Sequence, residues 1–543
     1  MTSPSADRPS GWELALLGLA LLLFLLLAAT VVVPAEEDAF IYYRYALNWA
    51  EGHGLVFNVG DPVEGFSSPL WMFLLAALAG LGFDLPRAAP VLGLVCGLAT
   101  LVATHGLARA AGLSRLGRLG VVFALALSPL FVLWARSGLE TPFYSFLLVL
   151  AARSYLAAQS APSRWRQWRA GLAIAPVTLG RPEGVLLLPL VFADRLADRD
   201  LRGALRSVLP GAVLYGAYLA WRFATYRALQ PNTSVKIYPL LVGRSTGQIA
   251  AYVLAVGVLP FVLPLLALLL PGDGSRRRIV FLFSMVLALS IFFNLAAGGD
   301  YRPGFRYMIP TLPHLLVAAW LAFERLGTSG TKTARFLVSA PARALFCAAL
   351  LAVPLAALAQ SPPRPAAWRQ AREIWLHPFA DSSHWGVGIA RWVDANVPPG
   401  SVVAFGQMGR VPYYVAARGH RVTFIDTLGL VDRQVAGIFR FDRKARDLAG
   451  GMLAGESFGQ ALERGRQRRA ALLAENLLAR RPDFILVEAY FEDLAPMRAL
   501  TASPGFAAAY RRLGALPARG APYVWIYARR EEKPARTPAL PGT

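Results

Sequence analysis

The sequence predicts a polytopic α-helical membrane protein with an α/β domain in its C-terminal third. Of its 543 residues 56% are hydrophobic and only 16% are charged, against roughly 25% in an average soluble domain. A membrane span needs about 20 apolar residues, and runs of nearly this length cover residues 12–33, 88–107, 252–270 and 279–297. The apolar content excludes a disordered chain, and the two cysteines exclude a disulfide scaffold.

The positive charge is distributed in the way that orients helices in a membrane. The formal net charge is +22, from 55 Lys and Arg against 33 Asp and Glu. The arginines form short clusters between the apolar runs, which is typical of cytoplasmic loops, and no nucleic-acid partner is expected. The clusters that mark the cytoplasmic side lie at residues 109–118, 153–169, 195–206, 276–278 and 325–343.

Two ambiguous segments decide the middle of the topology. If residues 69–83 and 170–193 each crossed once, seven arginines would lie outside. All basic clusters face inward if 69–83 is a juxtamembrane helix and 170–193 is a helix pair broken at Arg181-Pro182-Glu183-Gly184. Proline, glycine and charges within a span are tolerated only beside a polar cavity, which favours the broken pair. About eleven transmembrane helices result: 12–33, 88–108, 119–135, 142–159, 167–180, 184–194, 207–222, 249–271, 278–297, 307–324 and 341–359.

This topology gives a bacterial-type inner (plasma) membrane protein with a cytoplasmic N-terminus, a retained first span and a periplasmic C-terminal domain. The transmembrane module is predicted over 1–360, with a first outer loop over 34–87, and a disordered tail over 531–543. The extracytoplasmic α/β domain is predicted over 361–530. Within it, apolar runs at 401–405, 421–425, 483–488 and 523–527 predict strands, and residues 457–481 predict a helix.

Most distinctive polar segments fall on the predicted outer face. Carboxylates at the mouth of a membrane cavity are costly without partners or a function, arginine and lysine suit a phosphate, and aromatic rings suit sugar faces. Together these groups predict a site for a sugar carried on a lipid phosphate. The candidates are Glu37, Asp38, Tyr42, Glu64, Glu140, Arg181, Asn232, Lys236, Asp300, Tyr301, Arg302 and Arg306.

Each candidate also has a simpler structural interpretation. The acids after the first span suit a solvated helix end, and aromatic residues near helix ends are often interface anchors. Arg302 and Arg306 suit neutralisation of Asp300, and Arg181 suits a pair with Glu183. No histidine pair has metal-ligand spacing, and the Asp-x-Asp at residues 198–200 lies within a basic cluster on the predicted cytoplasmic side. No metal site is therefore assigned, and a divalent metal is compatible with the chemistry without being required by it.

Asp426 is the candidate in the C-terminal domain. It follows a predicted strand, where open α/β sheets bind ligands. The alternative is that Asp426 caps the following turn.

The first outer loop carries the most specific pattern in the chain. The segments at 37–46 (EDAFIYYRYA), 51–58 (EGHGLVFN) and 63–71 (VEGFSSPLW) resemble the terminal arabinofuranosyltransferase-like branch of the GT-C integral-membrane glycosyltransferases. Shorter similar segments extend to about residue 430. The resemblance implies a GT-C fold with outer-face catalysis, in which Asp38 is the catalytic carboxylate and Glu37 its neighbour. The branch commonly has two aspartates there, so the division of roles between Glu37 and Asp38 stays open.

The predicted function is an inverting glycosyltransferase. It moves arabinofuranose, or a similar sugar including a hexose, from a polyprenyl-phosphate donor to a cell-envelope glycan or glycolipid. Lys236, Arg302, Arg306 and Arg181 are assigned to the donor phosphate. The residues assigned to sugar or acceptor are Glu64, Glu140, Asn232, Asp300, Tyr42, Tyr301 and Asp426.

Two alternatives belong to other functional classes. One is a transporter or flippase of lipid-linked sugars, but the sequence has no internal repeat, which such proteins commonly show, and its polar segments crowd one face. The other is a non-catalytic scaffold for envelope assembly. The carboxylates and cations on the outer face argue against it.

Overall fold

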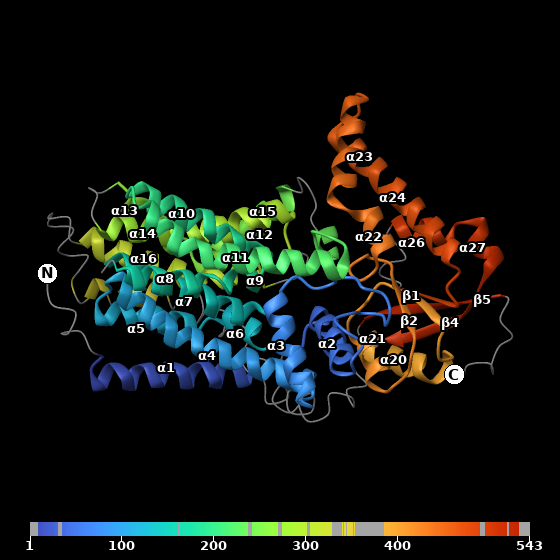
Figure 1. Ribbon diagram of the computed structural model, residues 1–543, viewed down its shortest axis with the longest axis horizontal. Coiled ribbons are helices and arrows are strands. Elements are labelled where there is room, and N and C mark those ends of the chain that lie inside the picture. The colour runs from blue at the N-terminus through green and yellow to red at the C-terminus, as the bar shows by residue number, and fades with distance from the viewer. Residues whose placement is uncertain are drawn as a thin grey trace.

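The chain folds into a helical bundle with an α/β domain at one end (Figure 1). The structure, a computed structural model, describes residues 9–30, 35–160, 163–236, 242–269, 274–300, 304–327, 339, 341–343, 345–350, 352, 385–488, 495–518 and 521–530. The bundle helices are α1 (Gly11–Thr30), α4 (Leu85–Ala111), α5 (Arg115–Ala126), α6 (Pro129–Ala135), α7 (Thr141–Ser160), α8 (Arg164–Ile174), α9 (Val177–Gly180), α10 (Leu187–Ala197), α11 (Leu201–Tyr226), α12 (Val242–Val256), α13 (Leu259–Ala267), α14 (Gly274–Val286), α15 (Phe293–Ala297) and α16 (Leu312–Gly327). Helices α2 (Glu37–Ala50) and α3 (Pro69–Gly80) lie where the bundle meets the α/β domain.

Within the described residues, three helical segments are long and apolar enough to cross a membrane. They are α1, α4 and the continuous stretch Gly274–Ala297. Two bent pairs raise the number to five: α5 with α6, bent by 61°, and α12 with α13, bent by 92°. The count of about eleven spans stays a prediction, and about half of the span expected at 341–359 lies outside the described residues.

The predicted break at residues 181–184 is confirmed. Helix α9 ends at Gly180, Arg181 adopts extended backbone angles, and a short 3-10 helix, η2 (Pro182–Leu186), leads into α10. A Cβ atom at Gly184 would overlap the carbonyl oxygen of Val177, so the tight return of the chain depends on glycine there. The break points the Arg181 and Glu183 side chains into the bundle.

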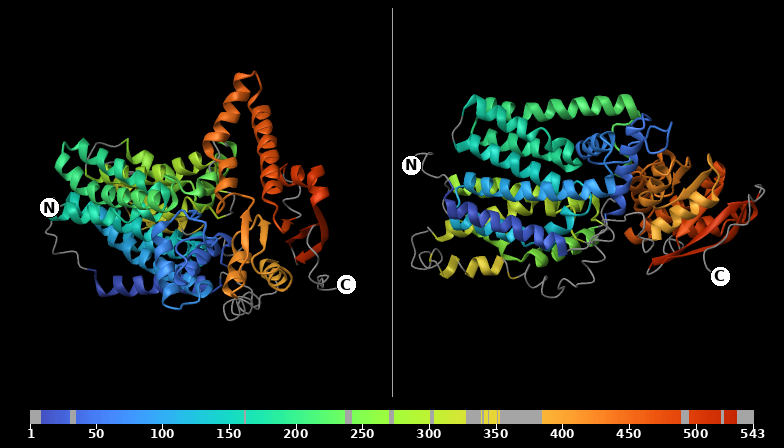
Figure 2. Two further views of the ribbon diagram at one scale, coloured as in Figure 1. Left: turned by 45° about the vertical axis from the view of Figure 1, so that its right-hand side comes forward. Right: turned by 90° about the horizontal axis from the view of Figure 1, so that it is seen from below.

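Basic residues from several of the described clusters gather at the end of the bundle far from the α/β domain. Glu13, in the first turn of α1, is fully buried and lies 2.9 Å from His105 and 3.6 Å from Arg118. Arg277 lies 3.0 Å from Asp194 at the end of α10. These pairs join the start of α1, the end of α4 and the start of α14 at one end (Figures 1 and 2). The predicted segregation of basic and distinctive polar segments is therefore present in the fold.

The α/β domain is built on a five-stranded mixed sheet in the order β2-β1-β3-β5-β4. β1 pairs in parallel with both β2 and β3, and β5 runs antiparallel to β3 and β4. The strands are β1 (Val402–Phe405), β2 (Thr423–Asp426), β3 (Phe484–Glu488), β4 (Tyr510–Ala518) and β5 (Ala521–Arg529). The helices are α20 (Trp385–Asn396), α21 (Arg410–Ala417), α22 (Arg433–Phe439), α23 (Phe441–Leu453), α24 (Phe458–Arg480), α26 (Ala495–Thr501) and α27 (Pro504–Ala509).

The predicted strands and the predicted partly parallel sheet are confirmed, and β4 was missed. Strand β4 begins Tyr-Arg-Arg and contains glycine and proline, so it lacks the apolar run that marked the others. The helix predicted over 457–481 is α24, which starts with a capping box between Ser457 and Gln460. Helices α23 and α24 pack against each other and project away from the bundle (Figure 2).

The first outer loop is bonded directly to the α/β domain. The side chain of Asn58 pairs with the backbone of Phe424 in β2, as a neighbouring strand would. Nδ2 of Asn58 donates to the carbonyl of Phe424 at 2.8 Å, and Oδ1 of Asn58 accepts from the N–H of Phe424 at 3.0 Å. Arg433 donates to the carbonyls of Pro62 and Tyr226, at 2.7 and 2.8 Å. The loop is thereby held between the bundle and the sheet.

Candidate active site

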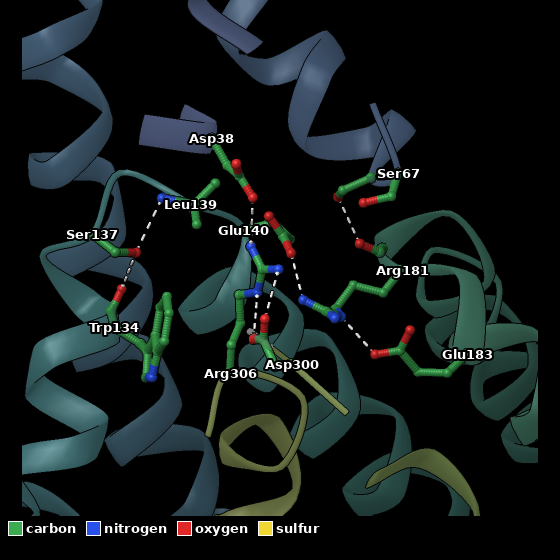
Figure 3. A network of polar contacts seen from close by, with 12 residues as sticks. Asp38, Ser67, Trp134, Ser137, Leu139, Glu140, Arg181, Glu183, Asp300 and Arg306 are labelled. Carbon is green, nitrogen blue, oxygen red and sulfur yellow. Dashed lines mark hydrogen bonds and ion pairs between the residues drawn. The ribbon is translucent and has the colours of Figure 1, made fainter. Parts of the chain in front are cut away.

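Asp38 lies in the first turn of α2 and faces Arg306. Its Oδ2 is 3.2 Å from Nη1 of Arg306, whose Nε and Nη2 reach the carboxylate oxygens of Asp300 at 3.2 and 3.5 Å (Figure 3). Exposed fractions of 9% for Asp38, 6% for Arg306 and 2% for Asp300 show that all three are buried. One guanidinium therefore bridges two carboxylates at the end of the bundle next to the α/β domain.

The backbone around Asp300 explains how that residue reaches the site. Helix α15 ends at Gly298, whose left-handed backbone (φ 75°) turns the chain back on itself. The side chain of Gln248 then binds both backbone groups of Asp300: its Oε1 accepts from the N–H at 2.8 Å, and its Nε2 donates to the carbonyl. These two hydrogen bonds fix the backbone of Asp300 in the turn.

A second ion-paired chain lies beside the first (Figure 3). Arg181 donates through Nη1 to Glu140 and through Nε to Glu183, both at 2.5 Å. The guanidinium carbons of Arg181 and Arg306 lie 5.2 and 5.3 Å from the centre of the Tyr307 ring, which stabilises both cations. The predicted alternatives, Arg181 with Glu183 and Arg306 with Asp300, are thus both present as contacts.

The charges of these two chains define what the site can accommodate. The described part of the network holds four carboxylates and two guanidiniums, each of which bridges two carboxylates. A phosphate entering here must replace a carboxylate on an arginine. Arg306 is the better placed, because one of its contacts goes to Asp38, whose side chain is 12% exposed, whereas both partners of Arg181 are more deeply buried.

Glu64 belongs to a separate cluster. It lies 2.6 Å from Nε of Arg222 and accepts a hydrogen bond from Tyr218, both on α11. Burial raises the pKa of Glu64, while Arg222 opposes that shift. The backbone N–H of Asn232 donates to the carbonyl of Glu64 at 2.9 Å. These contacts tie the first outer loop to the bundle, and the sugar-binding role of Glu64 stays a prediction.

Sequence reasoning missed the two partners of Glu64. Tyr218 and Arg222 stand four residues apart in the mostly apolar second half of α11, so they share one face. A charged residue within a predicted span was the signal available, because such residues are rare without a function or partner.

Tyr42 organises the loop that leads into α3. Its hydroxyl accepts from the backbone N–H groups of Ser67 and Ser68, at 3.3 and 3.1 Å, and its ring packs against Phe66. The side chain is buried and these contacts hold the loop in place, while the sugar-binding role of Tyr42 stays a prediction.

Asp426 caps a turn, which is the alternative that the sequence had left open. Its two oxygens accept from the N–H groups of Leu428 and Val431 at 2.8 and 2.9 Å. The side chain is fully buried, and this burial raises its pKa to about 7. Because Val431 packs on Gly65, the turn that Asp426 caps is in contact with the first outer loop.

Glu37 faces the α/β domain, although Asp38 faces the bundle. Its Oε1 accepts from the N–H groups of Gly409 and Arg410, at 3.1 and 2.9 Å. The catalytic role expected for Glu37 beside Asp38 stays a prediction, while its side chain is bound to the N-terminus of α21. Successive residues of a helix point about 100° apart, which explains how these neighbours contact different elements.

Three further candidates remain to be placed. Tyr301 and Arg302 lie outside the described residues, and Lys236 ends the short helix η3 (Asn232–Lys236). Among the described residues, no group of three His, Cys, Asp or Glu side chains is arranged to hold a metal ion.

The bundle with its buried network has the fold of the GT-C membrane glycosyltransferases. The structure is similar to ArnT from Cupriavidus metallidurans bound to undecaprenyl phosphate, with a TM-score of 0.56, 14% identity, and coverage of 96% of this chain and 99% of that one. It is also similar to the Archaeoglobus fulgidus oligosaccharyltransferase tethered with an acceptor peptide (TM-score 0.51, 14% identity, coverage 95% and 74%). Archaeal AglB from the same organism, in complex with an inhibitory peptide and a dolichol-phosphate, gives a TM-score of 0.51 at 13% identity, with coverage of 97% and 75%.

Sequence comparison adds one match. Residues 374–527 match a family described as a domain of unknown function, DUF8728, which covers the α/β domain. No curated protein matches the chain. The comparisons therefore establish the fold of the whole chain and a shared domain at its C-terminal end.

Proposed function

We propose that this protein is an inverting, polyprenyl-phosphate-dependent glycosyltransferase in which Asp38 is the general base. The observation that carries the proposal is the contact between Asp38 and Arg306, which stand 268 residues apart and meet at one buried point. A base for an acceptor hydroxyl and a cation for a leaving phosphate are the two groups that this reaction needs. The similar ArnT and AglB structures hold undecaprenyl phosphate and dolichol-phosphate, which supports a lipid-phosphate donor.

The proposed reaction is a single displacement. Asp38 takes the proton of the acceptor hydroxyl as its oxygen attacks the anomeric carbon of the sugar. The bond from that carbon to the phosphate oxygen breaks on the opposite face, and the electron pair leaves with polyprenyl phosphate. Arg306 stabilises the negative charge on that phosphate, and Lys236 and Arg302 are proposed to complete its binding.

The carboxylates around the base have supporting roles in this proposal. Asp300 orients Arg306 through two of its nitrogens. Glu140 lies beside Asp38 in Figure 3, where it is held by Arg181, and we assign it to a sugar or acceptor hydroxyl. Asn232, on the loop bonded to Glu64, is assigned to the same task.

The finer assignments rest on the resemblance of the first outer loop. We propose arabinofuranose or a similar sugar as the transferred group, and a cell-envelope glycan or glycolipid on the outer face of the membrane as the acceptor. The catalytic module occupies residues 1–360 and the extracytoplasmic domain residues 361–530. The gathering of the basic clusters at the far end of the bundle supports this orientation.

A transfer assay tests the proposal. Purified protein in nanodiscs is given a panel of polyprenyl-phosphate sugars with envelope extracts as acceptor, and release of polyprenyl phosphate is followed. Asp38→Asn is expected to lower the rate by about 10²–10⁴-fold, as loss of a general base does. The matched control is Asp394→Asn, which changes a partly exposed carboxylate paired with Arg418 in the α/β domain.

Two outcomes contradict the proposal. Undiminished turnover in Asp38→Asn removes Asp38 from the role of base. No release by the parent protein from any donor favours the flippase, and movement of lipid-linked sugar across liposome membranes is then the next measurement.

A further inference from the structure

The N-terminus of α21 binds a carboxylate that comes from outside the α/β domain. The chain leaves β1 at its carboxyl end, and this is the edge at which open α/β sheets bind ligands. Helix α21 starts here, directly after the loop that follows β1. The group bound at its N-terminus is the carboxylate of Glu37, which comes from α2.

The contacts at Glu37 are those of a bound anion. Two consecutive N–H groups of the α21 N-terminus donate to Oε1, and the guanidinium of Arg410 lies 3.8 Å from Oε2. Such hydrogen bonds to a charged group are strong, and the helix dipole favours a negative charge there. A Cβ atom at Gly409 would overlap the carbonyl oxygen of Glu37, so this approach depends on glycine.

Further contacts from the same short segment fix α2. The guanidinium of Arg410 lies 4.7 Å above the centre of the Phe40 ring and donates to the carbonyl of Ala35. One helical turn later, Arg44 of α2 donates to the carbonyl of Pro412 at 2.6 Å. Both ends of the first two turns of α2 are therefore attached to α21.

These attachments bear directly on Asp38. Glu37 and Asp38 share a peptide bond, so the position of the Asp38 backbone is set once Glu37 is bound. The helix then points the Asp38 side chain toward Arg306, 3.2 Å away. Catalytic geometry is sensitive at this scale, since a displacement of about 1 Å can cost 10²-fold in rate.

We infer that the α/β domain is a positioning element of the active site, in which Arg410 and the N-terminus of α21 hold Asp38 in place through Glu37. The inference rests on the proposed function for its catalytic consequence. Arg410 is a positioning residue in this arrangement, because it acts on Asp38 through Glu37 and α2. Its loss should slow the chemical step more than it weakens donor binding.

The test uses the full-length protein in nanodiscs and two measurements. Arg410→Ala is expected to lower kcat by about 10–100-fold, with KM for the polyprenyl-phosphate donor changed by less than about threefold. Amide hydrogen exchange across residues 37–46 is expected to rise at least about tenfold, while exchange across α7 stays the same. Arg410→Lys, which keeps the charge, should restore part of both.

The matched control is Arg418→Ala. Arg418 caps the other end of α21 and pairs with Asp394 inside the domain at 2.9 Å, without touching α2. It should leave kcat and the exchange of α2 unchanged. Glu37→Gln is the second variant: it keeps an oxygen for the two N–H groups, loses the charge that faces Arg410, and should fall between the parent and Arg410→Ala.

Two outcomes overturn the inference. A lower kcat with unchanged exchange in α2 means that Arg410 acts in another way. Faster exchange with unchanged kcat means that the attachment does not serve Asp38. If the parent protein transfers no sugar from any donor, the proposed function has failed, and the exchange measurement alone decides whether the domain holds α2.

Discussion

Arg306 bridges Asp300 and Asp38, and two variants can distinguish its role in stability from its proposed role in the reaction. Arg306→Gln removes the guanidinium and leaves the Asp300 carboxylate, with an exposed fraction of 2%, without the cation that binds both its oxygens. The double variant Asp300→Asn with Arg306→Gln removes both charges at once. Stability and activity should respond to these two variants in different ways.

The magnitude follows from the burial of the pair. Breaking a buried ion pair by removal of one partner costs about 3–5 kcal/mol, because a charge is left unpaired in a medium of low polarity. At roughly 2–4 °C per kcal/mol this predicts a fall in melting temperature of about 6–20 °C for Arg306→Gln. The double variant should regain most of that loss, because it removes the carboxylate charge that the single variant leaves without Arg306.

Activity should not follow stability. Both variants lack the cation proposed for the leaving phosphate, so both should lose about 10²–10³-fold in kcat, as loss of a transition-state donor does. Thermal melting in detergent and release of polyprenyl phosphate are measured on the same preparations. A double variant as unstable as the single one refutes the pairing, and a double variant that regains activity refutes the role of Arg306 in the reaction.

Two further predictions concern groups outside that bridge. Arg222→Gln removes the cation that pairs with the buried Glu64 and should lower the melting temperature. A second change, Glu64→Gln, should restore the melting temperature, with the rate of transfer kept within about threefold. If the second change does not restore stability, the two residues are not coupled. Burial raises the pKa of Glu488 to about 8, a shift that Gln407 opposes and Glu37 increases. The folded protein therefore keeps a proton that the unfolded chain loses near pH 4.5, and stability falls by up to about 1.4 kcal/mol per unit as pH rises toward 8. Glu488→Gln removes this fall, so its advantage in melting temperature should grow from pH 6 to pH 8, and a constant difference would contradict the assignment.

The features that the sequence could predict are those decided locally. Hydropathy and charge along the chain placed the basic clusters at one end of the bundle and the break at residues 181–184, because both depend on neighbouring residues. The contact of Arg181 with Glu183 was foreseen for the same reason, since the two stand two residues apart. The strands of the parallel core were found from short apolar runs.

The pairings across the chain could not be predicted. Any of several arginines could have reached Asp38, and it is Arg306 that does so, at 3.2 Å. Glu64 was chosen for its place in the first outer loop, yet its partner lies 158 residues away on α11. Packing between helices and strands decides which distant side chains meet, and that packing cannot be read from a single sequence.

The pair Glu37-Asp38 shows how neighbouring carboxylates of the same chemistry acquire different tasks. Helix α2 turns their side chains to opposite sides, so one meets Arg306 and the other meets the N-terminus of α21. Glutamate is a methylene longer than aspartate, and here its extended side chain spans the distance to the N–H groups of Gly409 and Arg410. The longer carboxylate therefore binds the α/β domain, while the residue proposed as the base has the shorter side chain.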